Sequence, residues 1–290
     1  MDCEPCSSID LHIHSSASDG SFAPTDILDM ALSLKLGAIA ITDHDTIKGS
    51  RDAMEAGIPA PLKFLSGVEI STAPPPQFQI SGSLHILGYG FRLDDPGLNG
   101  VLKQLQTARK ERNPRILGKL RELGIDLSMA DVRPDAADIQ LGRPHIAAAL
   151  LKKGHVSSIE EAFARYLGNG KPAYVDKYRV PCQDAIGTIQ EAGGLAVLAH
   201  PGLIRELDAR SLEQLVTALA AMGLKGIEVY FPQHDPTTTA QLARLARRSG
   251  LLQTGGSDFH GEINPDVRMG SGRGDLNIPY ALYEKIIALL

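Results

Sequence analysis

The sequence has no tryptophan and few other aromatic residues, with seven tyrosines and seven phenylalanines in 290 residues. Stacking platforms for single-stranded nucleic acid, which depend on aromatic side chains, would therefore be sparse. No apolar run approaches the ~20 residues that a membrane helix needs, so we expect no membrane partner. The short acidic N-terminus has no basic start and no apolar core, unlike a secretory signal.

Cysteine is also scarce. The three cysteines are Cys3, Cys6 and Cys182, and neither their odd number nor their spacing suggests a disulfide framework. This usage indicates a reducing compartment, and we expect a cytoplasmic protein. Cys3 and Cys6 form a C-x-x-C pair, but it precedes the first expected strand rather than opening a helix, which argues against a redox or zinc role.

Charge is unevenly distributed along the chain, whose net charge is −5. Residues 100–181 hold 15 Lys and Arg against 9 Asp and Glu, and the remainder holds 14 against 25. The basic stretch could cover an anionic substrate. A solvated helical surface is the alternative, because residues 103–121 follow the pattern of an amphipathic helix.

Apolar runs of strand length alternate with helical patterns. Strands are expected at 9–13, 38–42, 64–71, 84–90, 195–199, 226–230 and 251–255. Helices are expected at 24–36, after Thr46, and at 181–192, 208–222, 235–249 and 279–290. This alternation predicts βαβ units and a largely parallel sheet, and seven strands favour a closed or distorted barrel.

The alternation stops between residues 95 and 180. Only helices are expected there, at 95–123, 129–136, 143–153 and 158–167, before a turn-rich exit. We interpret 95–180 as a helical insertion that stands over one end of the barrel as a substrate cap. Residues 1–94 and 181–290 would form the barrel itself.

Six of the nine histidines lie in short motifs at or near the ends of expected strands. Residues two apart on a strand point the same way, so His12 and His14 can bind one ion. His85 taken alone would suit a core histidine better than a ligand. Histidines and carboxylates at nearly every strand end nevertheless predict one polynuclear metal site. The other candidate ligands are Asp19, His44, His200, Asp258 and His260.

Three acidic residues within or beside strands need an explanation. Glu69 lies in an apolar strand, where a buried carboxylate needs a partner, so it could bridge two ions; a surface position on an edge strand is the alternative. For Asp43 we favour a role in orienting His44 over a turn or capping role, and Thr46 suits the N-cap of the next helix. We interpret Glu228 as orienting or structural rather than as a ligand.

These residues carry a resemblance to a known family. The motifs Asp-Leu-His-Ile-His-Ser, Thr-Asp-His-Asp, Gly-Val-Glu-Ile-Ser, Ala-His-Pro-Gly and Gly-Ser-Asp-Phe-His, spread over residues 9–261, resemble those of the PHP (polymerase and histidinol phosphatase) superfamily. Segments 141–147 and 170–175 resemble the branch with nucleoside 3′,5′-bisphosphate phosphatases and a related 5′-to-3′ exoribonuclease. The resemblance implies an α/β fold, a distorted (β/α)7 TIM-like barrel with a helical insert.

The resemblance also implies a trinuclear metal site. His12, His14, Glu69 and Asp258 would hold the first ion, Glu69, His85 and His200 the second, and Asp19, His44 and His260 the third. Asp19 stands where other branches use histidine, and its oxygen favours manganese, or iron, over zinc at the third site.

A cluster of divalent ions suits phosphomonoester hydrolysis. Such ions lower the pKa of a bridging water, which Glu69 would help to hold, and the resulting hydroxide would attack phosphorus while the ions offset phosphoryl charge. No Gly-x-Ser-x-Gly or Walker motif is present, which argues against acyl-enzyme and P-loop chemistry.

A bisphosphate would need a second anion pocket away from the metals. Arg143 offers a fork of donors, and His145 follows two residues later. His234 follows a strand end and could protonate the leaving oxygen or contact the nucleotide; a structural histidine at a helix N-terminus is the alternative. Further candidates, each with a solvated charge as its alternative, are Lys171, Lys177 and Arg179.

The main hypothesis is therefore a metal-dependent phosphatase of a small nucleotide, which removes the 3′-phosphate of a nucleoside 3′,5′-bisphosphate such as pAp to give AMP and phosphate. The first alternative is a 5′-to-3′ exoribonuclease acting on RNA or short oligonucleotides; stable binding of duplex DNA is not expected. Histidinol phosphatase and amidohydrolase activities rank lower, because neither needs the basic insertion, and a binding protein that kept the fold would be expected to lose ligands.

Overall fold

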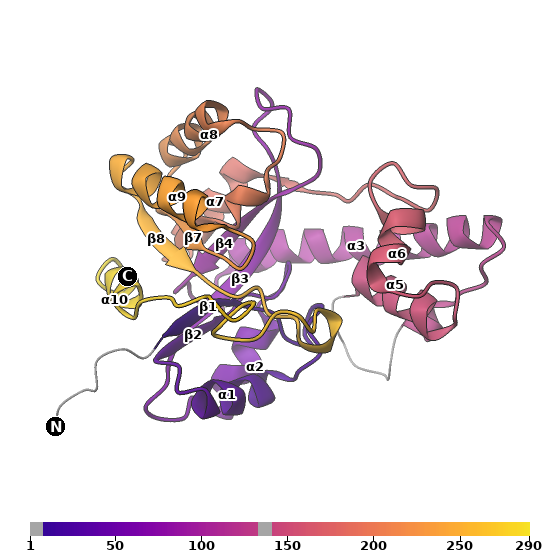
Figure 1. The fold of residues 1–290 in the computed structure, drawn as a ribbon, viewed down its shortest axis with the longest axis horizontal. Helices are drawn as coiled ribbons and strands as arrows, with labels where there is room; N and C mark the ends of the chain where they lie inside the picture. The colour runs from indigo at the N-terminus through magenta and orange to yellow at the C-terminus, as the bar shows by residue number, and fades with distance from the viewer. Residues whose placement is uncertain (1–7, 133–140) are drawn as a thin grey trace.

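A computed structural model describes residues 8–132 and 141–290, so Cys3 and Cys6 lie outside the described residues. Eight strands form one sheet, seven of them in the order β1-β2-β3-β4-β6-β7-β8, while β5 pairs with β3 (Figure 1). In chain order the strands are Ile9–Ile13, Ala38–Ile41, Lys63–Ala73, Leu84–Tyr89, Val180–Pro181, Leu195–Leu198, Gly226–Tyr230 and Leu252–Gly255.

The sheet is nearly closed. A bridge between Ile13 and Phe259 brings the chain after β8 against β1, which confirms the expected distorted barrel of the α/β class. Strand β4 runs antiparallel to both β3 and β6, and all other neighbours along the path are parallel. Because β4 is reversed, its first residues lie at the edge where its neighbours end, and His85 pairs there with Ser71.

Helices cover the barrel on two sides. Helices α1 (Pro24–Ser33) and α2 (Lys48–Ala56) lie beside β1 and β2, whereas α7, α8 and α9 lie beside the β4, β6 and β7 side (Figure 1). The remaining bounds are Cys182–Glu191 for α7, Ala209–Ala221 for α8, Pro236–Arg248 for α9 and Ala281–Ile287 for α10.

The predicted N-cap of α2 is wrong. Ile47 occupies that position, and Thr46 instead accepts the backbone N–H of Lys48 through Oγ1, at 3.2 Å. The helix still begins shortly after His44, so the one-residue difference in the N-cap does not change the position expected for this candidate ligand.

Between β4 and β5 the described chain is helical. Helix α3 (Pro96–Glu122) begins in the main core, where Leu98, Leu102 and Leu105 pack, and ends in a second core that contains Ile116 and Leu120. The other helices of this region are α4 (Met129–Val132), α5 (Arg143–Lys152), α6 (Ile159–Ala162) and the π-helical turn η1 (Phe163–Leu167).

Helix α3 therefore joins the two cores as one continuous helix. It carries α5 and α6 to the side of the barrel, at the right of Figure 1. The sequence predicted one helix at 158–167, and the structure divides it into α6 and η1; the end of the helix expected at 129–136 lies outside the described residues. Within the described part of the chain, no helix has the length and apolar character of a membrane span.

Candidate metal centre and adjoining pocket

The paired histidines of β1 face one carboxylate cluster. Their side chains are fully buried, and both Nε2 atoms lie near Glu69 Oε2, at 3.4 Å for His12 and 3.3 Å for His14. Asp258 Oδ1 lies 3.3 Å and 3.1 Å from the same two atoms. The two-residue period of the strand thus places both imidazoles on one side, as predicted.

Glu69 occupies the middle of the cluster. Its Oε2 lies 2.9 Å from His44 Nδ1, and its Oε1 lies 2.8 Å from His85 Nδ1 and 3.0 Å from His200 Nε2. Burial by itself raises the pKa of this carboxyl, but the nearby His44, His85 and His12 outweigh burial and hold the pKa well below its usual range. Glu69 therefore stays ionised among the imidazoles, and the alternative of a surface glutamate is excluded because only 1% of its side chain is exposed.

Asp19 gathers a second set of histidines beside the first. Its carboxylate oxygens lie 3.6 Å from His14 Nδ1, 3.8 Å from His44 Nε2 and 3.4 Å from His260 Nε2. His14 and His44 therefore face both Glu69 and Asp19, so the two sets form one continuous cluster.

The geometry of these residues fits divalent cations. Among the described residues, three groups bring one ligand atom from each member within 4.8 Å of one another: His12, His14, Glu69 and Asp258; His44, Glu69 and His85; and His14, Asp19, His44 and His260. Several of their buried atoms have no hydrogen-bond partner: His12 Nε2, both ring nitrogens of His14, His44 Nδ1, Glu69 Oε2 and His85 Nδ1. Buried polar atoms are rarely left unpaired, and imidazole with carboxylate is a donor set that transition metals prefer.

Glu228 and Asp43 support the cluster from outside. Glu228 Oε1 lies 2.9 Å from His12 Nδ1, and its Oε2 accepts the backbone N–H of His200 at 2.6 Å, which agrees with an orienting role. The orienting role expected for Asp43 is wrong. Its carboxylate accepts the N–H and hydroxyl of Ser15 and the hydroxyl of Ser18, so it shapes the loop that carries Asp19 rather than the His44 ring.

Three residues near the cluster have left-handed backbone conformations that β-carbons disfavour. They are Asp45 (φ 55°), His200 (φ 29°) and Asp258 (φ 55°). Non-glycine residues rarely adopt such angles, and they concentrate at functional sites, where surrounding structure enforces them. No sequence pattern signals these positions, because Asp and His are also common in ordinary turns.

A cavity of about 450 Å³ opens beside the cluster. One side of its lining is formed by Asp19, His44 and His85, and another by cationic side chains. Those cations are Arg109, Arg112, Arg143, Lys177 and Arg179. Three of the predicted substrate residues, Arg143, Lys177 and Arg179, are therefore brought to one cavity.

The other two predicted substrate residues do not line this cavity. Lys171 is exposed. His145 accepts the backbone N–H of Gly142 through Nδ1, at 3.1 Å, and so holds the first turn of α5. Burial lowers the pKa of His145, while the nearby carboxylate of Asp19 opposes that shift.

Two arginines that line the cavity were not predicted from the sequence. Arg109 and Arg112 lie one turn apart on α3, and only 9% and 5% of their side chains are exposed. Arg109 pairs with Asp45, whereas Arg112 Nε is buried without a hydrogen-bond partner. Burial, with repulsion from Arg109 and Arg143, lowers the pKa of Arg112 to about 10, so it remains charged at neutral pH.

The predicted cations are held firmly in place. Arg143 donates to the carbonyl of Leu167 at 2.9 Å, and its guanidinium lies 5.6 Å and 5.5 Å from the ring centres of Phe163 and Tyr174. Lys177 Nζ donates to Ser71 Oγ at 2.7 Å.

His234 has a structural environment. Its Nδ1 lies 2.9 Å from the carbonyl of Val229, and its Nε2 accepts the backbone N–H of Gly202 at 3.1 Å. Burial lowers the pKa of the ring. Both ring nitrogens are therefore occupied by backbone groups, which leaves neither available to protonate a leaving oxygen in this conformation.

Known proteins resemble this chain over nearly its whole length. The family model for the PHP domain matches residues 10–113. A 3′,5′-nucleoside bisphosphate phosphatase from Chromobacterium violaceum is 35% identical over 269 residues, with 89% of this chain and 90% of the relative covered. A 5′-3′ exoribonuclease from Haemophilus influenzae is 35% identical over 251 residues, with 87% and 89% covered. The crystal structure of a protein described as a metal-dependent phosphoesterase from Bifidobacterium adolescentis matches with a TM-score of 0.86 and 28% identity, covering 99% of this chain and 98% of that one.

Proposed function

The chain belongs to the PHP domain family and is a metal-dependent phosphoesterase, and we propose that it removes the 3′-phosphate of a nucleoside 3′,5′-bisphosphate such as pAp. The observation that carries this proposal is the charge of the cavity beside the metal centre. Among the described residues, no carboxylate forms an ion pair with Arg112, Arg143 or Lys177, although all three line that cavity. An excess of cations, one of them buried and two partly buried, is costly unless an anion offsets it, and a second phosphate group supplies that anion.

We assign the metal centre three divalent ions, with manganese favoured over iron or zinc. His12, His14, Glu69 and Asp258 would hold the first, with Glu69 shared by the second, to which His85 and His200 would also contribute. Asp19, His44 and His260 would hold the third. When bound, such ions supply hydroxide from water near neutral pH and offset the charge of the phosphoryl group.

The chain's own residues provide binding and orientation. Glu69 keeps its negative charge among the histidines and can be shared between ions. Arg112 and Arg143 would bind the phosphate that is not cleaved, and Lys177 would approach it from the last segment of the insertion, just before β5. Residues 95–180 would thus act as a substrate cap, because α3 carries two of the cavity arginines and α5 carries a third.

Relative rates on a substrate panel test this function. With manganese present, we expect phosphate release from pAp to exceed release from AMP and from histidinol phosphate, since only pAp offers a second phosphate to the cationic side chains of the cavity. Similar rates on all three, or hydrolysis of an amide or lactone instead, would show that the cavity does not select a bisphosphate.

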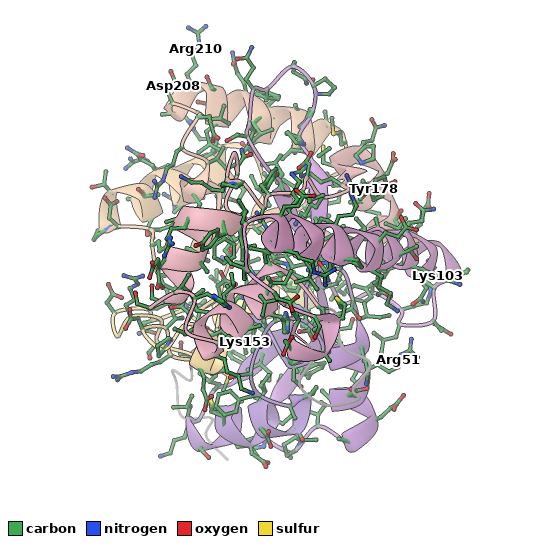
Figure 2. All side chains as sticks on the ribbon, turned by 90° about the vertical axis from the view of Figure 1, so that its right-hand side faces the viewer. Arg51, Lys103, Lys153, Tyr178, Asp208 and Arg210 are labelled. Carbon is green, nitrogen blue, oxygen red and sulfur yellow. The ribbon has the colours of Figure 1, made fainter. Side chains whose placement is uncertain are left out.

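A second candidate function, removal of nucleotides from RNA 5′ ends, is favoured by a separate basic groove. A cavity of about 440 Å³ between α2 and α3 is lined by Lys48, Arg51, Lys103 and Lys110. Arg51 and Lys103 lie on the same side of the molecule (Figure 2). If RNA follows this groove, its affinity should fall steeply with salt, whereas hydrolysis of a mononucleotide should change little.

A further inference from the structure

Asp45 joins the metal-binding strands to the cationic wall of the cavity. Its side chain is 2% exposed, and its backbone has a φ of 55°. The carboxylate accepts the N–H of Ser71 at 2.8 Å and the Ser71 hydroxyl at 3.0 Å, and it forms an ion pair with Arg109. Its carbonyl accepts from Gln106 Nε2 at 2.9 Å, so two of its partners lie on α3.

The same residue is fixed to the strand of the central glutamate. Its backbone N–H donates to the carbonyl of Glu69 at 2.9 Å, and the N–H of Glu69 donates to the carbonyl of Asp43 at 3.2 Å. In the chain, His44 lies between Asp43 and Asp45, and its ring faces both Glu69 and Asp19. The backbone of Asp45 therefore ties it to the strand of the ligands, whereas its carboxylate contacts Ser71 and the helix that carries the arginines.

A short relay extends this connection to the far side of the cavity. Lys177 Nζ donates to Ser71 Oγ, which in turn donates to Asp45. Asp45 is also the main carboxylate that opposes the fall in pKa caused by burial of Lys177 and by its three arginine neighbours. One carboxylate thus positions a lysine and an arginine that reach the cavity from different segments.

We propose that Asp45 is a positioning residue that sets the spacing between the metal centre and the cationic pocket, and so selects substrates with two anionic groups. This inference rests on the proposed function. A purely structural role would be to tie α3 to the barrel. In that case, loss of the Asp45 carboxylate would lower the stability of the protein and would reduce activity on all substrates alike.

The substitution Asp45→Asn isolates the charge. Asparagine tolerates a left-handed backbone nearly as well as aspartate, and it can still accept from the N–H of Ser71. It cannot pair with Arg109, and its amide would place a donor near the Ser71 hydroxyl. The matched control is Asp131→Asn, which removes an ion pair with Lys153 elsewhere in the insertion (2.7 Å) and away from the cavity lining.

The experiment compares both variants with the wild type on pAp and on p-nitrophenyl phosphate, which has a single phosphate. Metal content and AMP affinity are measured alongside. For Asp45→Asn we expect KM for pAp to rise ~10-fold or more and AMP to bind ~10-fold or more weakly, because a buried charge pair is broken. Metal content and the kinetics on p-nitrophenyl phosphate should stay within ~3-fold of the wild type, as should all values for Asp131→Asn.

The inference would be overturned if Asp45→Asn lost catalytic efficiency equally on pAp and on p-nitrophenyl phosphate, or if its KM for pAp were unchanged. A wild type that hydrolyses p-nitrophenyl phosphate but not pAp would refute the proposed function alone. The affinity for AMP then tests the positioning role of Asp45. Weaker AMP binding in Asp45→Asn than in the wild type supports that role. Equal affinity in the two proteins, or no detectable binding in either, refutes it.

Discussion

Glu228 contacts His12 and His200 at once, through its two carboxylate oxygens, although it is not itself close enough to join the ligand groups. The contact with Nδ1 orients the His12 ring so that Nε2 faces Glu69 and Asp258. The other contact fixes the backbone of His200, whose φ of 29° is unfavourable for a residue with a β-carbon.

Glu228→Ala should therefore weaken metal binding ~10- to 100-fold, because the ring of a ligand histidine is oriented by its outer partner. Metal titration followed by calorimetry measures this loss. Glu228→Gln should keep part of the affinity, since its carbonyl can still accept from His12. Glu213→Gln, which removes only a surface pair with Arg248, is the control. Equal affinity in Glu228→Ala and in the wild type would show that Glu228 does not orient the ligands.

Arg112→Met should raise KM for pAp by ~10-fold or more, because a charged donor that faces the second phosphate is lost. Its thermal stability should stay the same or increase, since the free protein no longer buries an unpaired charge. Steady-state kinetics and calorimetric melting test the two effects. Arg115→Met, an exposed arginine on the same helix, should change neither.

The charge of Lys177 should make substrate capture depend on pH. Burial lowers the pKa of Lys177 to about 7, so the free enzyme loses this positive charge as pH rises through that value. kcat/KM for pAp, which reports the free enzyme, should then fall above pH ~7. Lys177→Arg should flatten the profile, because arginine keeps its proton. A profile that is identical in both proteins would exclude Lys177 as the titrating group.

Lys177 should also affect stability with a definite sign. Its folded pKa of about 7 lies below the ordinary lysine value of 10.5, so between these values the unfolded chain binds the extra proton. The free energy of unfolding contributed by Lys177 therefore rises with pH across that window. Chemical denaturation at several pH values should show this rise in the wild type and a smaller one in Lys177→Met.

Metal removal should destabilise the protein, because bound ions offset the charges of buried Glu69 and Asp19 and of partly buried Asp258. Chelation should lower Tm, and manganese should restore it in proportion to the logarithm of its concentration. Glu69→Gln should lose activity and most of the metal-dependent change in Tm, since Glu69 lies at the centre of the cluster. A Tm that is insensitive to metal in the wild type would contradict the assignment of these residues as ligands.

Much of the metal centre could be predicted from local pattern. His12 and His14 had to share a side because strand periodicity is two, and parallel strands bring their carboxyl ends together. Although β4 is reversed, His85 still lies beside the other candidate ligands. An antiparallel strand brings its first residues to the edge of the sheet where its neighbours end. The sequence analysis favoured Asp43 as the residue that orients His44, but local pattern does not show which groups the carboxylates of Asp43 and Asp45 contact, since both residues flank His44 and both suit a turn.

The substrate pocket depended more strongly on tertiary structure. Arg109 and Arg112 follow the helical pattern of a solvated surface, and nothing local shows that α3 turns that side toward the metal centre. His234 looked available until the fold placed a carbonyl and an N–H against its two ring nitrogens. By itself, the sequence predicted the barrel and placed the candidate ligands at strand ends, because these expectations follow from short periodic patterns and from the motifs that resemble a known family. Only the tertiary structure decided which charges face the cavity, because burial and partners depend on contacts between residues far apart in the chain.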